Sequence, residues 1–141
     1  MRPALIVLLI AALCGCAQNR DATGFPIEER PSRNLPADVR LMWQTEPLSG
    51  RPGELASTPH AVDAAERVFF TVKLRGMTRH AVIRLLGDPQ HSNRSTYNFP
   101  FYPAPKDSMV YRFDTGAGGF QFNILFDRQD RVRKVQRYGI E

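Results

Sequence analysis

Apolar residues recur at helical spacing along residues 79–86, and the residues on either side of this segment are typical of helix ends. Val82 and Leu86 lie on one stripe, four residues apart, with polar residues on the other side. Thr78 is placed to cap the first turn through its hydroxyl, and Gly87 suits the left-handed residue that follows a last turn. The pattern predicts a helix of about two turns, whose stripe must be buried against another part of the chain.

A second helical pattern precedes this helix. Thr58 is a suitable N-cap, Pro59 is a suitable first residue, and apolar positions follow at helical spacing. Residues 68–74 are rich in β-branched and aromatic side chains and also fit a strand. We favour a helix that ends near Thr71 and then an extended link, which predicts an αα-hairpin with the helix over residues 79–86.

Beyond Pro89 the hydrophobic period changes from 3.6 to 2, which indicates antiparallel strands. The clearest strand is predicted over residues 119–127, where four apolar side chains share one face and Gln121 and Asn123 point away from it. The last strand, residues 131–138, breaks the alternation and predicts a bulge. Two further strands are expected over residues 92–98 and 108–114.

This order of elements predicts an α+β fold, in which a helix-helix hairpin packs on one face of a small antiparallel sheet of three to four strands. The pattern offers two apolar faces, the helix stripes and the phenylalanine-rich face of the sheet. We therefore expect these faces to cover each other within one domain over residues 58–141.

Residues 17–57 interrupt these patterns with five prolines and three glycines among polar residues. We expect an extended, partly disordered tether. One patch within it has apolar residues on one face of a short helix that begins at Pro36, with Asn34 as the candidate cap. Trp43 in this patch is either an anchor for a partner or for the lipid interface, or it folds back onto its own domain. The second role is favoured because a small domain gains from extra apolar cover.

The first 15 residues are typical of a bacterial lipoprotein signal peptide. An apolar run over residues 4–13 follows Arg2 and is too short to span a bilayer. The run ends in Leu13-Cys14-Gly15-Cys16, a lipobox pattern in which Cys16 receives the lipid, including palmitate. The alternative is an ordinary secretory signal with a chance cysteine. The pattern predicts cleavage before Cys16, so that residues 16–57 form the lipidated cysteine and its tether.

The residue after Cys16, the net charge and the cysteine content refine this assignment. Ala17 stands where an aspartate usually retains lipoproteins at the inner membrane, which favours an outer-membrane anchor facing the periplasm. Removing Arg2 with the signal leaves 18 of the 19 basic residues against 14 acidic ones, a net charge of +4 that requires no anionic partner. Cys16 is then the only cysteine, so we expect no disulfide and no thiol chemistry.

The sequence predicts neither an enzyme nor a cofactor, and no nucleic-acid partner. His60, His80 and His91 have no metal-ligand spacing with one another or with a pair of carboxylates. No nucleophile motif is present. The glycine cluster at residues 116–119 lacks the helix and lysine of a phosphate site and is typical of a hairpin loop. Binding is therefore the expected activity.

Two surfaces are candidates for binding. Phe99, Phe101 and Tyr102 lie in a proline-stiffened loop that presents an apolar patch to a partner, unless the rings fold over the sheet. The other is a basic run that suits anionic lipid or an acidic protein, although charged strands also prevent edge-to-edge pairing. We favour the loop. The residues of the basic run are Arg128, Arg131, Arg133, Lys134 and Arg137.

The helix over residues 79–86 also carries a family resemblance. Its Gly76-Met77-Thr78 opening, its Leu85-Leu86-Gly87 ending and Pro89 resemble the SmpA/OmlA/BamE family of outer-membrane lipoproteins. The similarity extends over about residues 60–138. The long tether and the aromatic loop depart from the family pattern.

The resemblance implies a BamE-like fold and a class of partner. BamE is an accessory lipoprotein of the machinery that inserts β-barrels into the outer membrane, and it contacts phosphatidylglycerol. By this resemblance we expect a protein that binds another envelope protein, such as a barrel-assembly subunit, and acts in envelope assembly or maintenance. The alternative is an inhibitor or sensor of a periplasmic enzyme, as in the related β-lactamase inhibitor fold, although that fold uses two copies of the repeat.

Overall fold

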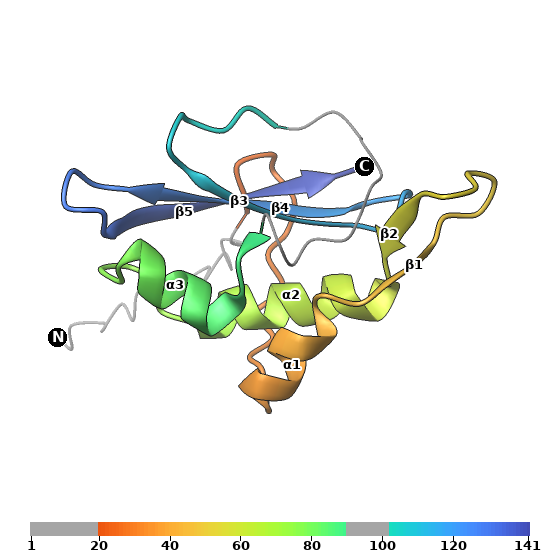
Figure 1. Cartoon of the computed structure of the whole chain (residues 1–141), viewed down its shortest axis with the longest axis horizontal. Helices are drawn as coiled ribbons and strands as arrows, with labels where there is room; N and C mark the ends of the chain where they lie inside the picture. Colours follow the sequence, from red (N-terminus) through yellow and green to blue (C-terminus); the bar gives the residue numbers. More distant parts are fainter. Residues whose placement is uncertain (1–19, 90–101) are drawn as a thin grey trace, which may run out of the picture.

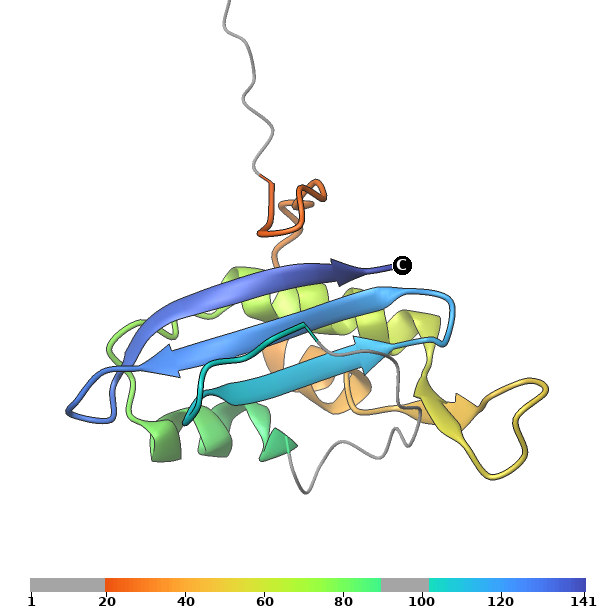
Figure 2. The same ribbon diagram turned by 90° about the horizontal axis from the view of Figure 1, so that it is seen from above.

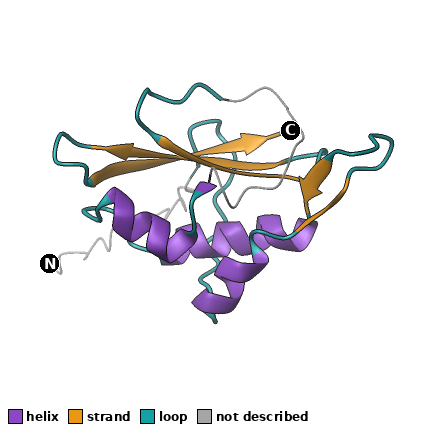
Figure 3. Ribbon diagram, viewed as in Figure 1, coloured by secondary structure: helices purple, strands orange, loops and turns teal. Residues whose placement is uncertain are grey.

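Three helices and two antiparallel sheets make up the computed structural model, which describes residues 20–89 and 102–141 (Figure 1). The helices lie together on one face of the larger sheet (Figure 3). The fold is therefore α+β, as predicted. In chain order the elements are α1 (Leu35–Leu41), β1 (Thr45–Pro47), β2 (Leu55–Ser57), α2 (Pro59–Thr71), α3 (Arg79–Leu86), β3 (Met109–Asp114), β4 (Gly119–Phe126) and β5 (Val132–Ile140).

Local capping sets the ends of α2 and α3, and both helices have the predicted bounds. The Thr58 hydroxyl accepts from the backbone N–H of Ala61 at 3.1 Å, and Thr78 does the same for Ala81 at 3.2 Å. After α3, Gly87 has a φ of 88°, a conformation that a residue with a Cβ rarely adopts. None of the helices in the described part of the chain is long and apolar enough to cross a membrane.

The larger sheet has the strand order β3-β4-β5 (Figure 2). A register shift between Leu125 and Phe126 forms the predicted irregularity against β5. Asp127 begins the turn between β4 and β5, since its Oδ1 accepts from the backbone N–H groups of Gln129 and Arg131 at 2.9 and 3.0 Å. The strand predicted over residues 92–98 lies outside the described residues.

The helix stripes and one face of this sheet bury each other. The ring of Phe69 on α2 stacks on Phe122 of β4, with centroids 4.0 Å apart and planes 7° from parallel. Val82 and Leu86 on α3 are fully buried in the same cluster. Each helix is too short to be stable alone, so this shared core is what holds both of them in place.

Residues 20–57 are not the free tether that their prolines and glycines predicted. Helix α1 starts after the cap of Asn34, as expected, and Asp38 on it forms an ion pair with Arg67 of α2 at 2.7 Å. Trp43 folds back into the core, where its Nε1 donates to the carbonyl of Leu86 at 2.8 Å.

A β-hairpin follows α1 in the same region. Strands β1 and β2 pair in an antiparallel ladder, and Gly50, Pro52 and Gly53 lie in the turn between them. These residues therefore mark a turn and not a disordered tether. The predicted boundary near residue 58 is wrong, because the folded body extends back to residue 20.

Candidate partner-binding site

The structure places the predicted aromatic loop only in part. Phe99 and Phe101 lie outside the described residues. Tyr102 is half-buried, and its ring stacks on Tyr138 of β5 with centroids 5.0 Å apart. Its backbone is fixed as well, because Gln121 accepts from the Tyr102 N–H at 3.2 Å and donates to the Tyr102 carbonyl at 2.9 Å. Tyr102 therefore covers the sheet and does not project from it.

The sheet face beneath Tyr102 is polar and yet buried. Gln121 and Asn123 point away from the phenylalanine-rich face, as predicted, but both are 0% exposed. Arg112 and Asp114 lie on the same face as a buried ion pair, with Nη2 and Oδ2 2.8 Å apart. The alternation predicted a polar face. It did not predict that this face is buried, because the segment that covers it lies outside the strands.

The basic run does not form one continuous surface. Arg131, Arg133 and Lys134 are exposed. Arg137 is not, since only 9% of its side chain is accessible, and it pairs with Asp21 at 3.1 Å and with Glu66. Including Arg137 in a lipid-facing or partner-facing run was therefore wrong. Its position on the helix side of β5 turns it into the domain.

An open groove of about 460 Å³ lies at the end of the sheet, between the loop before β3 and the turn from β4 to β5. Pro105 and Lys106 from the loop line one side, and Arg128 and Arg133 line the other. The groove thus brings together the described end of the predicted loop and part of the basic run, which the sequence had presented as separate surfaces.

Arg79 is the fixed centre of this groove. Its Nε donates to Asp130 at 3.0 Å, and its Nη2 donates to the carbonyl of Asp107 at 2.9 Å. The guanidinium carbon lies 4.0 Å from the ring centroid of Phe126, within cation–π distance. Arg79 therefore connects α3 to the loop before β3 and to the β4–β5 turn.

The remaining cations of the groove are available to a ligand. Lys106, Arg128 and Arg133 are exposed, and none of them forms an ion pair with another residue in the described ranges. Three acidic residues, Asp107, Asp127 and Asp130, also line the groove. Asp127 is engaged with the turn backbone and Asp130 with Arg79. Three free cations around a partly apolar groove suit an acidic segment of a protein, with affinity that falls as salt rises.

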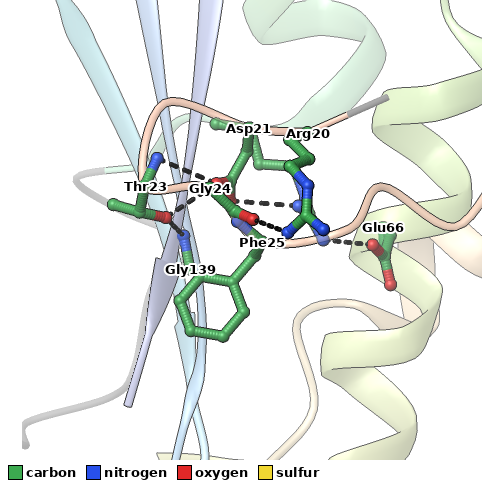
Figure 4. A network of polar contacts seen from close by, with 8 residues as sticks. Arg20, Asp21, Thr23, Gly24, Phe25, Glu66 and Gly139 are labelled. Atoms are coloured by element: carbon green, nitrogen blue, oxygen red, sulfur yellow. Dashed lines mark hydrogen bonds and ion pairs between the residues drawn. The ribbon is translucent and has the colours of Figure 1, made fainter. Parts of the chain in front are cut away.

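Residues 20–26 form a second feature that the sequence did not reveal, and we call them the N-terminal strap. They lie along the outer edge of β5 (Figure 2). There the N–H of Ala22 donates to the carbonyl of Arg137 at 3.1 Å. The N–H of Gly139 donates to the Thr23 hydroxyl at 2.9 Å (Figure 4). A Cβ at Gly139 would lie 2.5 Å from the Phe25 ring, so this ring occupies space that glycine leaves open.

Arg137 connects the strap to α2. Its guanidinium bridges Asp21 of the strap and Glu66 of the helix, and its Cζ lies 3.9 Å from the ring centroid of Phe120. Burial raises the pKa of Glu66 above its ordinary value, against the opposing effect of the Arg137 charge. The strap is therefore attached by buried polar contacts between residues more than a hundred positions apart.

The described residues offer no group of three histidine, cysteine or acidic side chains that could hold a metal ion. His60 and His80 are exposed on different helices, and His91 lies outside the described residues. Comparison with protein families, curated proteins and solved structures gave no match.

Proposed function

We propose that this chain is a lipid-anchored envelope protein whose α+β domain binds an acidic segment of another envelope protein. The anchor is Cys16, on the basis of the lipobox pattern that precedes it. The binding site is the groove lined by Lys106, Arg128 and Arg133. One observation carries the binding proposal: Lys106, Arg128 and Arg133 line the groove, are exposed, and form no ion pair within residues 20–89 and 102–141.

The proposal includes the finer assignment to a BamE-like domain. The capped helix that ends in Leu86-Gly87 and the order of two helices followed by antiparallel strands support it. It places the protein at the outer membrane, facing the periplasm, with a role in β-barrel assembly or envelope maintenance.

Site-specific photo-crosslinking in the cell's own membranes tests this proposal. A photoreactive amino acid at position 128 should give an adduct with one envelope protein, and the same amino acid at the exposed Arg84 on α3 should not. An adduct with a barrel-assembly subunit supports the proposed role, whereas an adduct with a periplasmic hydrolase supports the inhibitor or sensor alternative. Equal adducts at both positions, or none at 128, would contradict a binding groove.

Charge reversal then tests the chemistry of the contact with the purified partner. Arg128→Glu with Arg133→Glu should weaken binding at least tenfold at low salt, and the difference should shrink as ionic strength rises. Arg40→Glu with Arg84→Glu changes the net charge equally on exposed helix positions away from the groove and should leave affinity unaltered. Equal losses in both double variants would indicate only a general charge effect.

A further inference from the structure

The folded domain begins only a few residues after the predicted anchor. Cys16 precedes Arg20 by four positions, so the two Cα atoms lie at most roughly 14 Å apart even in a fully extended chain. From Asp21 onward the N-terminal strap is bonded to β5 and, through Arg137, to α2. The long tether expected over residues 17–57 is therefore replaced by a link of residues 17–19.

This short link limits how far the folded body can stand from a membrane. A lipid on Cys16 places that residue in the head-group layer, which is roughly 5–8 Å thick on each side of a bilayer. Arg20 therefore lies within roughly 14 Å of that layer, a distance little greater than the diameter of one helix with its side chains, about 10–12 Å. The edge that carries the strap is therefore the part of the domain that the anchor holds close to the lipid.

The same edge carries an apolar groove. It lies between the strap side of the domain and α2, and it is lined by Ile27, Glu66, Phe69, Phe70, Phe122, Val135 and Arg137. Phe70 is 42% exposed, and it is the one large apolar side chain in the described ranges that is exposed. Phenylalanine is among the residues that helices lying on a membrane bury at the boundary between head groups and acyl chains.

We propose that this edge, made of the N-terminal strap, the outer side of α2 and the apolar groove between them, lies against the lipid head groups, with Phe70 in the interfacial layer. The inference rests on the lipid anchor at Cys16, which is part of the proposed function. The short link selects the bilayer as the occupant of the groove, because it holds this edge within reach of the lipid in every anchored molecule.

Charge has a minor part in this contact. Glu28 and Glu29 accompany Arg20 and Arg30 near the strap, so the edge carries both signs. The interaction should therefore persist at high salt, unlike binding in the groove of Lys106, Arg128 and Arg133. This difference in salt response separates the two surfaces experimentally.

Depth-dependent fluorescence quenching tests the orientation. The acylated chain has no free thiol after signal removal, so a single introduced cysteine can be labelled with the fluorophore NBD. We would place it by Phe70→Cys or, as the control, by Arg84→Cys, and reconstitute the lipidated protein in phosphatidylethanolamine and phosphatidylglycerol vesicles. Both positions are exposed, so neither substitution removes core packing.

Spin-labelled lipids should quench the label at position 70 several-fold more than the label at position 84, equally at 50 and 500 mM salt. Equal quenching at both positions, or stronger quenching at 84, would overturn the orientation. Mass analysis of the N-terminal peptide in the same sample reports the lipid on Cys16. Absence of the lipid would overturn both proposals, whereas a lipidated protein with an unquenched label at 70 overturns the orientation alone.

A linker variant tests whether the short link causes the orientation. Insertion of 20 glycine and serine residues between Asn19 and Arg20 extends the reach to roughly 25 Å on average. Lipidation should be retained, and quenching at position 70 should fall toward that at position 84. Quenching that stays at the original level would contradict the role of the short link.

Discussion

Both faces of the three-stranded sheet contain fully buried residues, but the chemistry of their burial differs. On one face Tyr111, Phe113 and Ile124 are fully buried against the helices. On the other face Gln121 and Asn123 are equally buried, but they bond to each other and to the backbone of the segment above them. Alternation in the sequence assigned residues to a face correctly and did not show that the polar face was covered.

This difference predicts that the two faces respond differently to substitution. An apolar contact removed from the helix side leaves a cavity, whose cost grows with its volume. A polar contact removed from the other side leaves a buried donor or acceptor without its partner, whose cost depends on charge. The predictions below compare these responses from the largest expected effect to the smallest.

Leu86→Ala should have the largest effect, because Leu86 is completely buried between α3 and the apolar face. We expect the free energy of unfolding to fall by about 4 kcal/mol, measured by urea denaturation. Arg84→Ala, two residues earlier on the exposed side of α3, should change it by less than about 0.5 kcal/mol. The reverse order would show that the stripe of α3 is assigned to the wrong side.

Asp114→Ala should be the most damaging change on the polar face, because it removes the buried carboxylate that pairs with Arg112 and accepts from the N–H of Gly116. We expect a loss of about 3 kcal/mol in the same measurement. Replacing the pair together, by Arg112→Met with Asp114→Leu, should recover most of that loss. If the double variant is no more stable than the single one, the lost stability does not come from the buried charge of Arg112 after removal of Asp114.

Gln121→Leu should cost about 1–2 kcal/mol, because it removes hydrogen bonds to Tyr102 without removing a charge. The amide of Tyr102 should also exchange with solvent faster in hydrogen-exchange measurements, since Gln121 is its acceptor. Gln129→Leu in the exposed β4–β5 turn is the matched control and should alter neither quantity. An unchanged exchange rate of the Tyr102 amide would show that Gln121 does not hold the covering segment in place.

Tyr111→Phe should have the smallest effect at neutral pH, about 1 kcal/mol, from the loss of the 2.7 Å bond to the Gly87 carbonyl. Burial raises the pKa of Tyr111 above its usual value of 10, and the charge of Asp88 adds to this. The stability linked to this shift is fully present below pH 10 and is lost as pH rises above it. Urea denaturation at pH 8 and 10.5 should therefore show a smaller alkaline loss in the variant; an identical loss would exclude Tyr111 as its source.

Local signals made α2, α3 and the large sheet predictable. Thr58, Thr78 and Gly87 act within a few residues of their own helix ends, and alternation marks β4 directly. The covered polar face and the N-terminal strap were not predictable in this way. Asp21 meets Arg137 across 116 positions, and a sequence pattern gives no sign of such a pairing.

The candidate site was predictable to a similar extent. Arg133 was identified from its exposed strand, whereas Arg137 appears identical in sequence and is buried by two acidic partners. The groove itself depends on Arg79, which lies on a helix far from the basic run in sequence. Proline and glycine content was misleading in residues 49–53, because these residue types serve ordered turns as well as disordered tethers.

Lipid attachment at Cys16 is the claim on which both the cellular location and the membrane-facing edge depend. The direct measurement is incorporation of labelled palmitate, followed by separation of membrane and soluble fractions, for the natural chain and for Cys16→Ser. We predict that the natural chain is labelled and sediments with the membrane, and that the variant is unlabelled and either unprocessed or soluble. A variant that remains labelled and equally membrane-bound would contradict the account.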